Sequence, residues 1–283
     1  MIGLTKPVSK GAQAVVTGAG SGIGRSFAVE LGRRGADVVC SDIDEGRAKE
    51  TLGLVEQVGG SGLATRCDVA DSDDVLSLRE RALDRFDSAP TLLINNAGIG
   101  AGGHSVGVSS LTHWQQTLQV NLWGVIHGCH HFLPVMKAAG RGGVINVASA
   151  AGFAAGPRMA AYNVSKAGVM SLSETLAAEL GGSGVRVTVL CPTFVKTNIF
   201  SGELIEAEAA AAAARLAKFV GMSPGKVAAM TLDAHDKGRL YVVPQLDARA
   251  IWLAKRLTPT THARVASLLT RLAPLPPEPE GTP

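Results

Sequence analysis

Several features that mark other protein classes are scarce in this chain of 283 residues. Aromatic side chains make up only 4%, so the core must be built from Ala, Val, Leu and Ile, with 34 glycines allowing close backbone approach. The 27 basic and 24 acidic side chains nearly cancel to a net charge of +3, which disfavours nucleic acid and other polyanions as partners. A hydrophobic fraction of 46% excludes a disordered chain, and the composition predicts a globular α/β protein.

Cysteine and long apolar runs are sparse as well. The four cysteines lie far apart, without a Cys-x-x-Cys pair, at Cys40, Cys67, Cys129 and Cys191. Disulfide-stapled domains and zinc modules cluster their cysteines, so we interpret these as reduced thiols of a cytoplasmic protein. The first ten residues lack an apolar stretch of signal-peptide length, and no 18-residue window is strongly apolar and uncharged throughout. Secretion and a transmembrane segment are therefore not expected.

Short apolar runs alternate with helix-length segments along most of the chain. The runs expected to be strands are residues 13–17, 36–41, 62–67, 91–95, 143–148, 185–190 and 240–243. Strands buried on both faces have such patterns, so the alternation predicts a Rossmann-type, doubly wound parallel sheet of about seven strands with helices on both faces. Ligands of such sheets bind beyond the carboxyl ends of the strands, so functional residues are expected in the loops that follow strands.

We expect one dehydrogenase-sized domain over residues 1–245, with helices at 207–218 and 224–235 in a substrate lid over about 198–236. Residues 246–273 are interpreted as a helical extension, and the proline-rich residues 274–283 as a disordered tail. No acidic residue occurs from Ala248 to Pro277, although basic residues surround apolar ones there. Packing on the body or on a sister subunit is the favoured interpretation, and peripheral contact with an anionic membrane is the alternative.

A glycine cluster, T-G-A-G-S-G-I-G at residues 17–24, follows the first predicted strand and opens a helix expected over residues 23–34. Backbone N–H groups and the dipole at a helix N-terminus attract phosphate, and glycines allow the tight turn and close packing. The strand–loop–helix context predicts a dinucleotide site. Its predicted residues are Gly18, Ser21, Gly22, Ile23 and Gly24.

Asp42 ends the second predicted strand, where a carboxylate can accept hydrogen bonds from a ribose diol. The same carboxylate opposes a 2′-phosphate, because like charges about 4 Å apart at an effective dielectric of ~20 repel by about 4 kcal/mol. NAD is therefore favoured over NADP. Compensation of the carboxylate by Arg25 or Arg47, and a helix-cap role for Asp42, are the alternatives.

The spacing Thr-Gly-x-x-x-Gly-x-Gly resembles the short-chain dehydrogenase/reductase family, and later motifs strengthen the resemblance over about residues 10–200. These are N-N-A-G at residues 95–98, then Asn121, Ser149 and the Tyr-x-x-x-Lys motif at residues 162–166. The resemblance implies a catalytic tetrad of Asn121, Ser149, Tyr162 and Lys166. It further implies hydride transfer between a nicotinamide cofactor and a secondary alcohol or ketone, without a metal, by a homodimer or homotetramer.

The residues of the tetrad also have chemistry of their own. Tyr162 and Lys166 share one face of a helix, so the ammonium, with the positive nicotinamide of an oxidised cofactor, is expected to lower the pKa of the phenol from near 10. Tyr162 is then the acid/base, and Ser149 orients and polarises the substrate oxygen. By resemblance, Asn121 lies in a helix over residues 112–131 whose irregularity holds a water next to the lysine.

Further cofactor contacts are implied by the resemblance. Asp68 and Val69 face the adenine, Asn95, Ala97 and Gly98 line the adenosine ribose and the sheet edge, Lys166 holds the nicotinamide ribose, and Pro192, Val195 and Thr197 hold the carboxamide. Thr193 replaces a glycine of the family pattern. A β-branched residue does not easily adopt a positive φ, so the turn is expected to differ slightly.

The residues expected to line the substrate pocket are Ser149, Phe153, Pro157, Phe194, Ile199, Phe200 and Leu204. Their apolar character favours a steroid, terpenoid or fatty alcohol, and simple packing of the lid by the aromatics is the alternative. His127 and His131 share a helix face near Cys129 and His130, but no carboxylate lies within that turn, so no metal site is predicted. The alternative function is a non-catalytic dinucleotide-binding regulator or scaffold.

Overall fold

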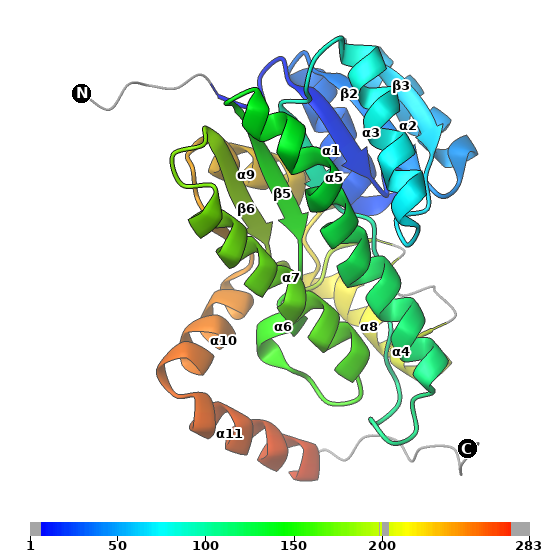
Figure 1. The fold of residues 1–283 in the computed structure, drawn as a ribbon. Helices are drawn as coiled ribbons and strands as arrows, with labels where there is room; N and C mark the ends of the chain where they lie inside the picture. The colour runs from blue at the N-terminus through cyan, green and yellow to red at the C-terminus, as the bar shows by residue number, and fades with distance from the viewer. Residues whose placement is uncertain (1–6, 198, 200–203, 273–283) are drawn as a thin grey trace.

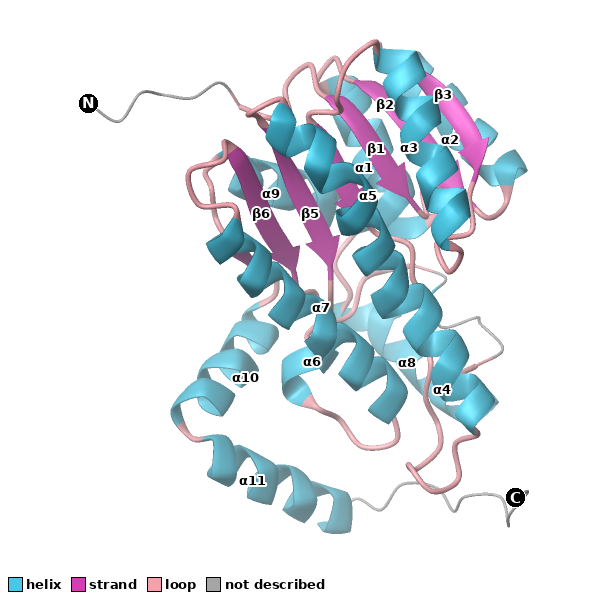
Figure 2. Cartoon of the chain, in the orientation of Figure 1, coloured by secondary structure: helices cyan, strands magenta, loops and turns pink. Residues whose placement is uncertain are grey.

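The structure, a computed structural model, describes residues 7–197, 199 and 204–272. Its centre is a parallel sheet of seven strands in the order β3-β2-β1-β4-β5-β6-β7, with helices on both faces (Figures 1 and 2). The strands are β1 Gln13–Thr17, β2 Asp37–Asp42, β3 Ser61–Arg66, β4 Leu92–Asn95, β5 Gly142–Val147, β6 Val185–Leu190 and β7 Tyr241–Val242. The predicted Rossmann-type sheet is confirmed, with strand ends within about two residues of those expected.

The helices form two layers because alternate residues of each strand face opposite sides of the sheet. In β1, Val15 joins one core cluster, while Ala14 and Val16 join the other. The first cluster is covered by α3 (Ser72–Phe86), α5 (Gly124–Ala138) and α7 (Ala160–Glu179). The second is covered by α1 (Gly22–Arg33), α2 (Glu45–Gln57) and α9 (Pro224–Asp236).

The remaining helices lie around the carboxyl ends of the strands (Figure 1). They are α4 Leu111–Leu118, α6 Ala151–Ala154, α8 Ala207–Val220, α10 Leu246–Leu257 and α11 Pro259–Leu272. A helix predicted over residues 112–131 is interrupted: α4 and α5 are joined by a π-helical segment, Gln119–Trp123. The loops that follow β4, β5 and β6 enter the same region, as the topology requires.

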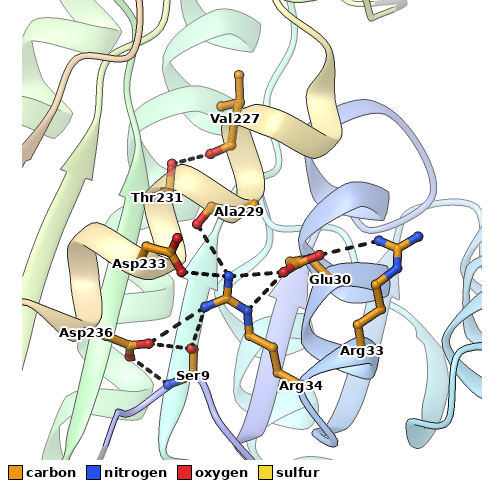
Figure 3. Close-up of polar contacts among 9 residues, drawn as sticks. All are labelled: Ser9, Glu30, Arg33, Arg34, Val227, Ala229, Thr231, Asp233 and Asp236. Carbon is orange, nitrogen blue, oxygen red and sulfur yellow. Dashed lines mark hydrogen bonds and ion pairs between the residues drawn. The ribbon is translucent and has the colours of Figure 1, made fainter.

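Charged side chains tie α1 to α9 and to the segment before β1 (Figure 3). The guanidinium of Arg34 lies 2.8 Å from Asp233 and 3.0 Å from Glu30, and it donates to the Ser9 hydroxyl at 2.9 Å. Ser9 in turn donates to Asp236 at 2.6 Å. Because α9 is held and buried in this way, it belongs to the layer on the sheet. The C-terminal part of the segment predicted as a lid is thus α9, which packs in the second core cluster.

The predicted helical extension consists of α10 and α11. The inner face of α10 packs on the core through Ala248, Ile251 and Trp252, and the Trp252 ring lies 5.2 Å from that of Tyr241. None of the described helices has the length and hydropathy that a bilayer-spanning segment needs. The tail predicted at residues 274–283 lies outside the described residues.

Candidate active site

The loop between β1 and α1 is shaped by glycines that leave no room for a side chain. Gly18 has a φ of +62°, and a Cβ there would lie 2.7 Å from the Cα of Ala97. A Cβ on Gly24 would lie 2.1 Å from the carbonyl oxygen of Gly18. Ser21 precedes α1 without a side-chain capping bond, and the first turn carries no acidic residue. The first N–H groups of α1 are thus free of a side-chain cap, and the cradle fits a pyrophosphate.

Asp42 lies at the carboxyl end of β2 beside this loop. Its carboxylate accepts hydrogen bonds from the backbone N–H of Gly20 at 2.8 Å and of Asp44 at 3.1 Å. The two arginines that were considered as compensating charges have other partners. Arg25 lies 3.0 Å from Glu50, and Arg47 lies 3.2 Å from Asp44. Neither arginine is therefore an unpaired positive charge beside the carboxylate of Asp42.

The loop after β4 is joined to the glycine loop through Asn96, a residue of the N-N-A-G motif to which the sequence analysis gave no role. Its side-chain amide donates to the carbonyl oxygens of Thr17 at 2.9 Å and Gly18 at 3.1 Å. The neighbouring Asn95, which was expected to line the ribose, points the other way. Asn95 is only 2% exposed, and its side-chain amide donates to the side-chain oxygen of Asn146 at 2.9 Å. The pleat of β4 thus directs the Asn95 side chain into the core, so any contact of this residue with a ribose would come from its backbone.

Three residues of the predicted tetrad converge where β5 ends and α7 begins. The Lys166 ammonium lies 5.8 Å from the centre of the Tyr162 ring and donates to the Val147 carbonyl oxygen at 3.0 Å. Tyr162 hydrogen-bonds with Ser149, whose hydroxyl also accepts from the backbone N–H of Ala151 at 3.2 Å. The Tyr-x-x-x-Lys spacing therefore places phenol and ammonium on one face of α7, as predicted.

The pKa values at this site depend mainly on burial. Burial raises the pKa of Tyr162 above its ordinary value, and the hydrogen bond with Ser149 lowers it in part. The expectation that Lys166 lowers this pKa is not met in the protein alone. Burial also lowers the pKa of Lys166, from 10.5 to about 8. Both groups are thus shifted toward their neutral forms, as desolvation requires.

Asn121 occupies the π-helical segment, so the helical irregularity implied for it is present. Its side chain is buried and makes paired bonds with the backbone of Ile99: the oxygen accepts from the N–H at 2.8 Å, and the amide donates to the carbonyl at 2.9 Å. A Cβ on Gly98 would lie 3.0 Å from the Asn121 oxygen and 3.3 Å from the Lys166 nitrogen. Asn121, Gly98 and Lys166 therefore meet at one point.

The loop after β6, which was predicted to hold the carboxamide, lies at the same edge of the sheet as the loops after β4 and β5. Thr193 does not adopt a positive φ, so the turn accommodates a β-branched residue. Its N–H donates to the side-chain oxygen of Gln245 at 3.2 Å, and the Gln245 amide donates to the Phe194 carbonyl at 3.1 Å. Thr197 reaches the opposite wall, because its methyl group lies 3.1 Å from where a Cβ of Gly22 would be. Gln245, just before α10, gave no signal in the sequence.

The predicted adenine side lies after β3. Asp68 accepts a hydrogen bond from the N–H of Ala70 at 3.0 Å, and its own N–H donates to Asp74 at 3.0 Å. Val69 is buried, and its carbonyl oxygen lies 3.0 Å from Nδ1 of His127. Asp68 and His127 also line an open hollow with Gln119 and Trp123. The side chain of Val69 therefore packs in the core beneath this hollow.

The residues predicted to contact substrate fall into different environments. Phe153 is buried in the core cluster, and Pro157 is exposed at the surface, so neither side chain lines the enclosed cavity near the site. Phe194 is half-buried, and Phe200 lies outside the described residues.

A cavity next to Ala161, one residue before Tyr162, has a lining of which the sequence analysis named only Leu204. Polar and apolar side chains share it: His104, His113, Trp114, Arg158, Met159 and Leu204. Nδ1 of His104 is buried there without a partner among the described residues. The side chains come from the loop after β4, from α4, from the turn before α7 and from the segment before α8. Only the tertiary fold assembles them.

The histidines of α5 form no cluster suited to a metal. His131 bonds the Ser72 hydroxyl through Nε2 at 2.9 Å, and burial with the neighbouring His130 lowers its pKa. No three potential metal-ligating residues gather anywhere in the part of the chain that the structure describes. The His131 ring instead forms part of the contact between α3 and α5.

The fold and site together define an α/β protein that holds a dinucleotide across the carboxyl ends of a parallel sheet. The model of the short chain dehydrogenase family matches residues 12–207. Since this is more than half of the chain, the protein belongs to the short-chain dehydrogenase family.

Individual relatives support this membership. The probable oxidoreductase EphD of Mycobacterium tuberculosis is 40% identical over 185 residues, which are 65% of this chain and 31% of EphD. The chain thus spans about a third of that relative. The cyclohexanol dehydrogenase of an Acinetobacter species is 35% identical over 195 residues, 69% of this chain and 77% of the relative.

A solved structure resembles nearly the whole chain. A short-chain dehydrogenase/reductase from Burkholderia phymatum, crystallised with NAD, is 33% identical, with a TM-score of 0.80. The match covers 96% of this chain and 99% of that one. The likeness therefore extends beyond the residues that the family model matches.

Proposed function

We propose that this chain is an oxidoreductase that transfers hydride between NAD and a secondary alcohol or the matching ketone. The observation that carries the proposal is the convergence of Tyr162, Ser149 and Lys166 at the end of β5, next to a glycine loop that fits a pyrophosphate. A bound oxidised nicotinamide would supply the hydride acceptor and a positive charge. A non-catalytic regulator has no need of this phenol beside a buried amine, so that alternative is not favoured.

In the oxidative direction Tyr162 takes the proton of the substrate hydroxyl, and Ser149 donates a hydrogen bond to the oxygen on which charge develops. The Tyr162 pKa is raised by burial, so the phenolate needs positive charge close by. Lys166 provides it in its protonated form, held by the Val147 carbonyl. The side chain of Asn121 fixes the backbone of Ile99, and a water held at the π-helical segment would pass protons from the lysine toward solvent.

The proposed preference for NAD rests on Asp42. The hydrogen bond from Gly20 holds its carboxylate at the carboxyl end of β2, where the adenosine ribose of a bound dinucleotide would lie. Arg25 pairs with Glu50 and Arg47 pairs with Asp44, so neither guanidinium is left unpaired to bind a 2′-phosphate. A phosphate there would meet uncompensated negative charge.

The substrate proposed is a secondary alcohol with an apolar body, of which an alicyclic alcohol is the simplest case. Trp114, Met159 and Leu204 line the cavity beside Ala161, but its volume of about 20 Å³ holds no more than a water, so the proposal rests on the apolar character of these side chains and not on a preformed space. A relative of this chain is a cyclohexanol dehydrogenase. Steroid, terpenoid and fatty alcohols remain part of the same proposal as larger members of the class.

The experiment uses both tyrosines of the chain. A panel of cyclohexanol, hydroxysteroids, terpenoid alcohols and secondary fatty alcohols is followed at the nicotinamide absorbance with NAD and with NADP. Tyr162→Phe is expected to lower kcat by at least roughly a thousandfold and to leave the Kd for NAD nearly unchanged. Tyr241→Phe, which removes an outlying hydroxyl bonded to Glu174, is the matched control and should keep wild-type turnover.

Wild-type turnover by Tyr162→Phe would show that the catalytic assignment is wrong. Loss of NAD binding in the same variant would instead indicate a structural role for the phenol. The homo-oligomeric state and cytoplasmic location stay predictions from the sequence, and they do not enter this test.

A further inference from the structure

The helix α10 has two apolar faces. Its inner face packs on the body through Ala248, Ile251 and Trp252. Leu246, Leu253 and Leu257 follow one another at spacings of seven and four residues, which places them together on the outer face. They are 78%, 53% and 78% exposed. A helix already anchored on one side thus presents a second apolar face that no described residue covers.

The next helix continues this surface. Val265 and Leu268 of α11 are 49% and 54% exposed, and three residues apart they share a helix face. Arg264 and Arg271, also exposed, are seven residues apart and share another. Apolar and basic faces side by side are typical of a helix that lies in a polar–apolar interface.

Charge indicates what this surface meets. The two helices carry one acidic residue, Asp247, against five basic ones: Arg249, Lys255, Arg256, Arg264 and Arg271. The Arg256 guanidinium lies over the Trp252 ring at 5.1 Å, which keeps its charge at the outer edge of α10. A second copy of the same surface would bring like charges together. An anionic surface with an apolar interior complements both the charges and the leucines.

The surface is firmly attached next to the proposed site. Gln245, just before α10, bonds both Thr193 and Phe194, and Arg249 donates to the Val243 carbonyl at 2.7 Å. His262 of α11 lies 3.3 Å from the carbonyl oxygen of Ala154 in α6. Figure 1 shows α11 below the sheet, on the side where the strands end and beside α6. Whatever α10 and α11 contact is therefore close to the loops that carry Ser149 and Phe194.

We propose that α10 and α11 form a docking surface for anionic phospholipid membranes. Leu246, Leu253, Leu257, Val265 and Leu268 enter the boundary between headgroups and acyl chains, and the exposed Arg256, Arg264 and Arg271 contact the headgroups. The protein lies on the membrane and does not span it. The docking does not depend on the proposed reaction, although it would bring a lipid-dissolved alcohol close to the site.

The test measures co-sedimentation of the full chain with vesicles of phosphatidylcholine alone or mixed with phosphatidylglycerol. Binding is expected only to the mixed vesicles and should weaken as salt is added. Replacing Leu246, Leu253 and Leu257 together by Ser should weaken binding by at least roughly tenfold. Its control replaces Val106 and Leu111 by Ser; these are exposed apolar residues elsewhere on the surface, and binding should not change.

A second pair of variants tests charge. Arg264→Gln with Arg271→Gln should weaken binding to mixed vesicles by several-fold, whereas Arg33→Gln with Lys49→Gln, which removes the same charge far from α11, should not. NAD affinity and circular dichroism of every variant confirm that it is folded.

Three outcomes would overturn the proposal. In the first, the wild type binds neither kind of vesicle, and in the second it binds both equally. In the third outcome the triple Ser variant changes the molecular mass in solution but not vesicle binding, which would show that a second copy covers α10.

Discussion

The two halves of the sheet build their parts of the site from different material. Around β1 and β2 the site consists of backbone: glycines, the first N–H groups of α1, and a single deciding carboxylate, Asp42. Around β5 and β6 it consists of side chains from separate segments, such as Ser149, Lys166 and Asn121, each held by buried polar bonds. In the first half, a side-chain atom added to Gly18 or Gly24 would clash with the backbone. In the second half, the side chains can act together only if each has the correct burial and distances.

The largest expected effect tests the backbone half. Gly24→Ala places a methyl group 2.1 Å from the Gly18 carbonyl, so the loop must shift, and NAD should bind at least roughly a hundredfold more weakly in calorimetric titrations. Gly53→Ala in α2, where nothing lies within 4 Å, is the control. It should bind NAD normally and raise stability by about 0.5–1 kcal/mol. Equal NAD affinity in both variants would contradict the backbone character of this half.

The second effect concerns a buried side chain under β6. His235 bonds Thr188 through Nδ1 at 2.9 Å, and burial lowers its pKa from 6.5 to about 4. As pH falls below 6.5, the unfolded chain takes up a proton that the folded protein refuses, so the free energy of unfolding falls, by roughly 3 kcal/mol at about pH 4.

Urea denaturation of wild type and His235→Leu at several pH values measures this effect. Between about pH 7 and pH 5 the variant should lose about 2 kcal/mol less stability than the wild type. Parallel pH profiles for the two proteins would show that the pKa of His235 is the same in the folded and unfolded states.

The third prediction tests whether the Asp42 carboxylate, in the backbone half of the site, sets the preference between NAD and NADP. Asp42→Asn removes the charge that opposes a 2′-phosphate, so the ratio of kcat/KM for NAD over NADP should fall by roughly tenfold to a hundredfold. Glu45→Gln, close by at the start of α2 and paired with Lys49, should leave the ratio unchanged. If both variants behave alike, net charge rather than position sets the preference.

The smallest effect concerns the bonds that hold the two halves together (Figure 3). Arg34→Met leaves Glu30, Asp233 and Asp236 without their shared cation and should cost about 1–3 kcal/mol in urea denaturation. Arg33→Met removes one exposed pair with Glu30 and should change stability by less than about 0.5 kcal/mol. A larger loss for Arg33 would mean that α9 is not held through Arg34.

Parts of the second half were predictable from local pattern, and parts were not. The spacing of Tyr162 and Lys166 was sufficient to place them together on α7. The inward orientation of Asn95 could have been inferred, because strand alternation puts it on the same face as Leu93 of the first core cluster. The raised pKa of Tyr162 could not, since it depends on how much of the surrounding protein excludes water.

Residues distant in sequence were the least predictable. Gln245 supports Thr193 and Phe194 from just before α10, and no motif marks it. Phe153 was expected among the apolar residues of the pocket, and the short helix α6 turns its side chain into the core. In both cases the contact is made across the fold, where sequence spacing carries no distance information.

The sequence alone determined the parallel sheet, the glycine loop at its first crossover and the order of the residues that carry the chemistry, because apolar periodicity and glycine sterics act over a few neighbouring residues. The tertiary structure alone decided which of those side chains meet, which are buried and which face of the C-terminal helices stays exposed. Burial and proximity depend on segments that are far apart in the chain, and packing brings those segments together only when the whole domain folds.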